Sequence, residues 1–105
     1  MSAIDEFTSL LETTEVMRQA LRSLKEEPAV LLSAICRDYR VSGQPVPDHR
    51  LPLAGYMGEA ALKALLSAGL VEQHPGGRIS LYSYEPTEKG LQQYQKLEAE
   101  GFYRR

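Results

Sequence analysis

The sequence predicts a mainly helical α+β fold in which a small β-hairpin lies between helices. Apolar residues recur at three- and four-residue steps over most of the chain, as on the buried face of amphipathic helices. Between residues 71 and 82 the period changes to two around Pro75-Gly76-Gly77, as expected for two strands joined by a turn. With 105 residues, 43% apolar and 25% charged, the chain fits one globular domain.

The first predicted helix is long and spans residues 3–26. Ser2 and Asp5 resemble an N-terminal capping box, and the proline at position 28 ends the run. Pro28 also suits the first position of a second helix, which we expect to end at Gly43. The pattern therefore predicts a long N-terminal flanking helix followed by a shorter, mostly buried one.

Two more helices are predicted before the hairpin. Asp48 is a candidate N-cap for a short helix that Gly58 interrupts. The segment EAALKALLSAG, residues 59–69, predicts a further helix that ends at Gly69 and turns leucines inward. At 100° per residue, the opposite face points outward. That outward face comprises Ala60, Lys63, Ala64 and Ser67.

The hairpin and the last helix follow. On the second strand, Ile79 and Leu81 alternate with polar or half-polar neighbours, and we expect these two side chains to pack on the helical core. Thr87 is a candidate N-cap for a last helix over residues 87–103. The order of elements is thus four helices, a hairpin and a helix, which contains the helices-then-hairpin order of a winged helix.

The segments ALKALLSAGLVEQ and GGRISLYSYEPTEKG resemble winged helix-turn-helix regulators of the MarR and PadR type. In these proteins the recognition helix ends in a Leu-x-x-x-Gly-Leu-Val-like turn, and the wing runs into Tyr-x-x-Thr-x-x-Gly. The close match covers residues 61–90, with a looser fit over 28–60. The matching positions are Leu65, Gly69, Leu70, Val71, Tyr84, Thr87 and Gly90.

This resemblance implies a single domain over residues 1–105, with a winged-helix core at 28–86 between flanking helices at 3–26 and 87–103. The recognition helix would span about 58–68 and the wing about 71–85. The implied function is DNA-binding transcriptional regulation, with the helix in the major groove and the wing tip at the minor groove. The implied DNA-binding residues are Arg50, Ala60, Lys63, Ala64, Ser67, His74 and Arg78.

The outward face of the recognition helix leaves a second function open. This face is small and nearly uncharged, whereas base edges are usually contacted by Arg, Gln, Asn or Ser. Such a face also suits a winged helix that binds a protein partner and no DNA. The net charge is −2, with the excess acidity in residues 1–36, which indicates that a monomer binds DNA weakly.

A homodimer would double the contacts with DNA phosphates. The apolar stripes of the first and last helices supply the candidate dimer surface, and the alternative is that these helices fold onto their own domain. The candidate dimer residues are Leu10, Met17, Leu21, Leu24, Leu91, Tyr94, Leu97 and Phe102.

The sequence predicts no catalytic, metal or cofactor site. His49, His74, the single cysteine Cys36 and the scattered carboxylates form no triad, metal-ligand spacing or phosphate loop. Cys36 lies on a helical face, so we expect a buried thiol. The N-terminus is acidic and no apolar run approaches the roughly 18 residues of a membrane span, so we expect a cytoplasmic protein without membrane contact.

Overall fold

The computed structural model describes residues 2–24, 26–51, 53 and 55–104, so the helical predictions at positions 25, 52 and 54 lie outside the described residues. The fold is mainly helical with a three-stranded antiparallel sheet, which confirms the predicted α+β class. The elements in chain order are α1 (Ala3–Leu11), α2 (Glu15–Leu24), α3 (Glu27–Ser42), β1 (Val46–Pro47), the 3₁₀ turn η1 (Asp48–Arg50), α4 (Gly55–Ser67), β2 (Val71–Pro75), β3 (Tyr82–Pro86), α5 (Glu88–Ala99) and η2 (Phe102–Arg104).

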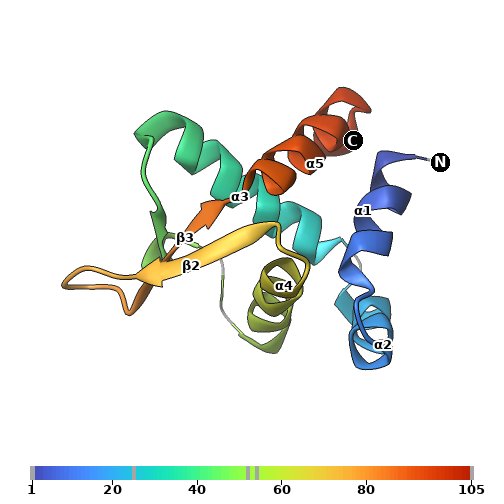
Figure 1. Cartoon of the computed structure of the whole chain (residues 1–105), viewed down its shortest axis with the longest axis horizontal. Helices are drawn as coiled ribbons and strands as arrows, with labels where there is room; N and C mark the ends of the chain where they lie inside the picture. The colour runs from blue at the N-terminus through green and yellow to red at the C-terminus, as the bar shows by residue number, and fades with distance from the viewer. Residues whose placement is uncertain (1, 25, 52, 54, 105) are drawn as a thin grey trace.

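The sheet has the strand order β1-β3-β2. β2 pairs with β3 from Val71 opposite Pro86 to Pro75 opposite Tyr82, and β1 joins the other edge of β3. In Figure 1 the connection between β2 and β3 extends to the left, away from α1, α2 and α5. The predicted hairpin is therefore present, whereas the two-residue strand β1 was not expected from the loop-like sequence around it.

The core is one cluster of buried side chains, with α3 at its centre in contact with α4, α5 and the sheet. Removing this apolar surface from water stabilises the fold by roughly 25 cal/mol per Å² buried. Among the largest of the fully buried side chains are Phe7, Leu11, Leu24, Leu32, Ile35, Leu65, Leu70, Tyr94 and Leu97.

The prediction of one N-terminal helix over residues 3–26 is wrong. α1 ends at Leu11 and α2 begins at Glu15. The break follows from the two threonines between them: the Thr14 Oγ1 accepts a hydrogen bond from the Met17 amide at 3.0 Å and so starts a new helix. Because of this break, α1 packs against α5 while α2 packs against α4.

The prediction of a short helix after Asp48 is also wrong. Residues 48–50 instead form a single 3₁₀ turn that ends at Arg50. Leu51, which follows, is extended, the conformation favoured before a proline. The Asp48 side chain does not cap this turn and instead accepts a hydrogen bond from the Tyr82 amide at 3.4 Å. Gly58 does not interrupt α4, which runs from Gly55 to Ser67.

The second strand begins later than predicted, at Tyr82, and the two apolar residues of the turn before it face solvent. Ile79 and Leu81 are 83% and 81% exposed, so the prediction that they pack on the helical core is wrong. Ser80 between them is the buried residue. The Gly76 amide donates to the Leu81 carbonyl at 3.0 Å, which closes a turn over residues 76–81 before β3 begins.

The start of α5 is tied to the turn between α4 and β2 by the residues that carry the resemblance. The prediction that Thr87 caps this helix is confirmed: its Oγ1 accepts from the Gly90 amide at 3.1 Å and donates to the Gly69 carbonyl at 2.7 Å. The Thr87 amide donates to the Leu70 carbonyl at 3.0 Å. α5 ends at Ala99, earlier than the predicted position 103.

Candidate nucleic-acid interface

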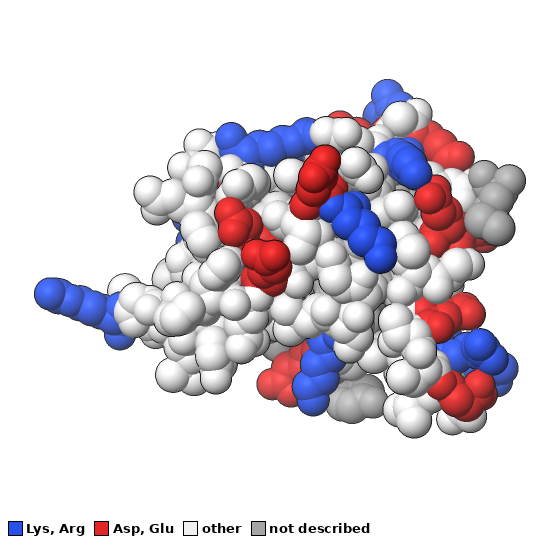
Figure 2. Space-filling model, viewed as in Figure 1, with Lys and Arg blue, Asp and Glu red and all other residues white. Residues whose placement is uncertain are grey.

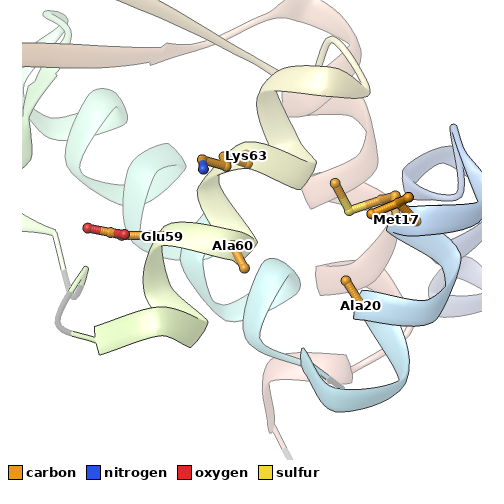
Figure 3. A pocket seen from close by; sticks show the side chains of 6 residues that line it. Met17, Ala20, Glu59, Ala60 and Lys63 are labelled. Atoms are coloured by element: carbon orange, nitrogen blue, oxygen red, sulfur yellow. The ribbon is translucent and has the colours of Figure 1, made fainter.

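The exposed side of α4 is narrower than the sequence predicts. Lys63 and Ser67 are exposed as predicted, but Ala60 is half-buried and Ala64 is fully buried, so the prediction that Ala64 faces outward is wrong. Ala64 belongs to the buried core cluster, and α2, which packs against α4, covers part of Ala60. Figure 3 shows Met17 and Ala20 of α2 facing Ala60.

An acidic residue shares the exposed side of α4 with Lys63. Glu59 lies one helical turn before Lys63, is exposed and points the same way, away from α2 (Figure 3). Its carboxylate would repel a phosphate that approaches Lys63. The predicted DNA-binding set contains only basic, small and polar residues and does not include Glu59.

α2 and α4 enclose a shallow pocket of about 190 Å³. Apolar side chains from both helices line most of it, and two charged residues belong to α4. The lining comprises Val16, Met17, Ala20, Glu59, Ala60 and Lys63. Val16, which lines this pocket, is 78% exposed, so an apolar side chain beside α4 remains open to solvent.

The turn between β2 and β3 carries one basic residue, Arg78, which is exposed. Figure 2 shows a basic side chain projecting beyond the tip of the hairpin. Among the residues that the structure describes, none forms an ion pair with Arg78 or with Lys63. Over the rest of this face, acidic and basic side chains are interspersed and do not form a continuous basic strip (Figure 2).

η1 supports the turn that carries Arg78. The His49 Nδ1 is hydrogen-bonded to the buried Ser80 hydroxyl, and a hydrogen bond from Ser80 is the main cause that lowers the pKa of Asp48. Arg50, at the end of η1, is already paired: its Nη2 lies 3.3 Å from the Asp38 Oδ2. Asp38 therefore neutralises part of the Arg50 charge, while the 54% exposed Arg50 side chain keeps further N–H donors.

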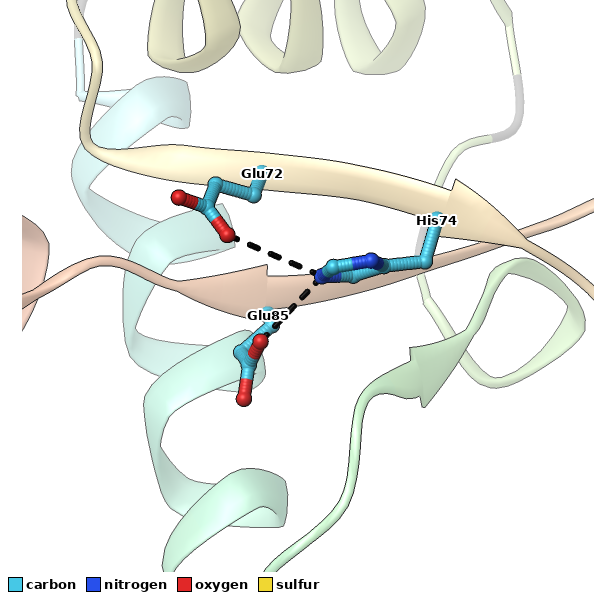
Figure 4. A group of neighbouring side chains, drawn as sticks. All are labelled: Glu72, His74 and Glu85. Atoms are coloured by element: carbon cyan, nitrogen blue, oxygen red, sulfur yellow. Dashed lines mark hydrogen bonds and ion pairs between the residues drawn. The ribbon is translucent and has the colours of Figure 1, made fainter.

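His74 lies between two carboxylates, Glu72 and Glu85. Its Nε2 is 3.1 Å from the Glu85 Oε2 and 3.7 Å from the Glu72 Oε2 (Figure 4). The register places Glu72 directly opposite Glu85. These acidic neighbours disfavour the approach of a phosphate to His74, and only the strand register, which the sequence did not supply, brings the three residues together.

The predicted dimer residues divide into two groups. Leu21, Leu24, Tyr94 and Leu97 are buried in the core of this chain and are not available for a subunit interface in this structure. The Tyr94 hydroxyl donates to Glu98 at 2.8 Å and accepts from the Arg37 Nε at 3.2 Å. The half-buried residues of the set are Leu10, Met17, Leu91 and Phe102.

Comparisons of the chain with protein-family models, with curated proteins and with solved structures find no match. None of the described helices combines the length and the apolar character that a bilayer crossing requires. The function must therefore be inferred from the fold and the surface of this chain.

Proposed function

We propose that this chain is a winged-helix protein that binds double-stranded DNA as a transcriptional regulator. The observation that carries the proposal is the order α3, β1, η1, α4 and the hairpin β2-β3, with β1 paired to β3. In a winged helix this order presents one helix and one ribbon to the same duplex. The resemblance of residues 61–90 to MarR and PadR regulators supports the same assignment.

In this proposal α4 approaches the major groove with Lys63 and Ser67, and the β2-β3 turn brings Arg78 to the backbone or the minor groove. Lys63 and Arg78 are exposed, and no described residue neutralises either charge. Arg50 adds a third cation, whose charge Asp38 partly neutralises. Ala60 and His74 contribute little, because Ala60 is half covered by α2 and carboxylates flank His74.

A single chain offers few cations, so its DNA affinity is low and strongly salt-dependent. A homodimer doubles the number of phosphate contacts and sets the spacing of two half-sites. In the proposed dimer the interface uses the half-buried residues Leu10, Met17, Leu91 and Phe102. The buried members of the predicted dimer set stay in the core of each subunit.

The test is a fluorescence-anisotropy titration of labelled duplex DNA at several salt concentrations. Lys63→Ala and Arg78→Ala should each weaken binding and reduce the slope of log K against log salt by about 1. Arg104→Ala is the matched control: it removes one exposed positive charge next to the C-terminus, on the opposite side of the molecule from the β2-β3 turn (Figure 1). Absence of saturable binding even at low salt, or an equal loss in all three variants, would contradict the proposal.

A second candidate function is a protein-interaction module, and one observation favours it. Ile79 and Leu81 are more than 80% exposed on the same turn as Arg78, and Tyr82 beside them is 44% exposed. Clustered exposed apolar side chains are typical of surfaces that bind protein partners. The double variant Ile79→Ser/Leu81→Ser separates the two functions. If the turn contacts DNA through Arg78, the DNA affinity of this variant should be unchanged. If the double variant loses binding to a protein partner that Arg78→Ala still binds, the second function is supported.

A further inference from the structure

We infer that Glu72, His74 and Glu85 form a binding site for a divalent transition-metal ion, with Zn²⁺ as the ion that suits the ligand set. Two ligands come from β2 and one from β3 (Figure 4). The inference does not depend on the proposed DNA binding, because it rests only on these three side chains and their neighbours.

The geometry of the strands brings the three ligands together. Residues 72 and 74 share one face of β2 because side chains alternate along a strand, and Glu85 lies directly opposite Glu72 on β3. One ligand atom from each residue lies within 4.8 Å of the other two. Two of these separations, 3.1 and 3.7 Å, bracket the spacing of about 3.4 Å between tetrahedral ligands bound to zinc at about 2.1 Å.

The charges of the cluster favour a cation. Glu72 and Glu85 form a cross-strand pair of like charge, an arrangement that destabilises a sheet. A divalent cation between the two carboxylates replaces their repulsion with attraction to a shared ion. The Glu72 side chain is 61% exposed, so it can move the short distance that coordination requires.

The surroundings of the cluster also suit a metal. Tyr39, on α3, hydrogen-bonds to the Glu85 carboxylate and so orients one ligand from outside the cluster. One imidazole nitrogen and two carboxylate oxygens are a ligand set that zinc accepts, and three protein ligands leave a fourth position for water. A bound ion would link β2 to β3 and stabilise the folded chain by mass action.

The experiment is isothermal titration of the chelator-treated full chain with ZnCl₂, combined with thermal unfolding in the presence and absence of zinc. We expect one zinc ion per chain and a zinc-dependent rise in Tm. His74→Ala and Glu85→Gln should weaken zinc binding by at least about tenfold, and Tyr39→Phe by about tenfold. Glu85→Gln keeps the shape of the side chain, so a loss of binding there cannot be attributed to unfolding.

Two control variants should bind zinc as the wild type does. His49→Ala removes the other histidine of the chain, and Glu88→Gln removes an exposed carboxylate that lies outside the cluster. If zinc fails to bind or to raise Tm, the cluster is only a network of ion pairs and the inference is overturned. Binding that persists unchanged in His74→Ala and Glu85→Gln would place the ion elsewhere and would also overturn it.

Discussion

At the scale of single residues, Gly90 illustrates how one backbone contact restricts residue type. A Cβ at this position would clash with the Leu70 carbonyl oxygen, a backbone atom that cannot move aside as a flexible side chain can. We predict that Gly90→Ala lowers the free energy of unfolding by about 1–3 kcal/mol, measured by urea denaturation. In the control Gly77→Ala the added methyl group enters open space, so the change should stay below about 1 kcal/mol in either direction. Equal effects of the two substitutions would show that the close approach to Leu70 is not the cause.

Cys36 provides a second prediction at this scale. The residue is completely buried, and burial raises the pKa of its thiol to about 12. Since the thiolate is the reactive form, the folded chain should not react with a disulfide reagent near neutral pH, and reaction should become fast in denaturant.

The raised pKa of Cys36 also affects stability. The unfolded chain releases the thiol proton at a lower pH than the folded chain, so the free energy of unfolding should fall as the pH rises from about 9 toward 12. Burial raises the pKa of Tyr103 as well, so Cys36→Ala should remove only part of this alkaline loss, measured by urea midpoints across that range.

At the scale of elements, the turn over residues 76–81 yields a prediction that opposes the sequence pattern. Because Ile79 and Leu81 face solvent, the double variant Ile79→Ser/Leu81→Ser should change the free energy of unfolding by less than about 0.5 kcal/mol per site. Leu65→Ala, in the core of α4, is the comparison and should cost about 2–5 kcal/mol. A large loss of stability in the double variant would mean that these side chains pack on the core after all.

The same elements show what the sequence could and could not predict. Hydrophobic periodicity predicts α3 and the hairpin, and capping chemistry predicts the Thr87 cap, because each of these depends on local sequence. The alternation of two around Ile79 predicts a strand, but residues 76–81 form a turn in which Ile79 faces solvent, and β3 begins only at Tyr82. The burial of Ala64 depends on the packing of α4 into the core, and the approach of Glu85 to His74 depends on strand register. Both are tertiary features that no local pattern contains.

At the scale of the whole molecule, the distribution of charge sets how strongly the chain can bind DNA. The net charge is −2, and the face shown in Figure 2 carries acidic and basic side chains side by side. DNA affinity depends on how many basic side chains contact phosphates. At physiological ionic strength, exposed charges interact mainly within a Debye length of about 8 Å. An acidic residue next to Lys63 should therefore weaken binding much more than one on α5.

Glu59 is that residue, and its removal tests the proposed orientation of α4 on DNA. Glu59→Gln raises the net charge by one, and we predict that it strengthens binding several-fold in the anisotropy titration at about 0.15 M salt, where distant charges are screened. Gln95→Lys also raises the net charge by one but does so on the exposed surface of α5, so it separates a local effect from a global one. If only Glu59→Gln strengthens binding, the side of α4 that carries Lys63 faces the duplex. If both variants strengthen it equally, the chain responds to overall charge alone, and α4 is not the surface that contacts DNA.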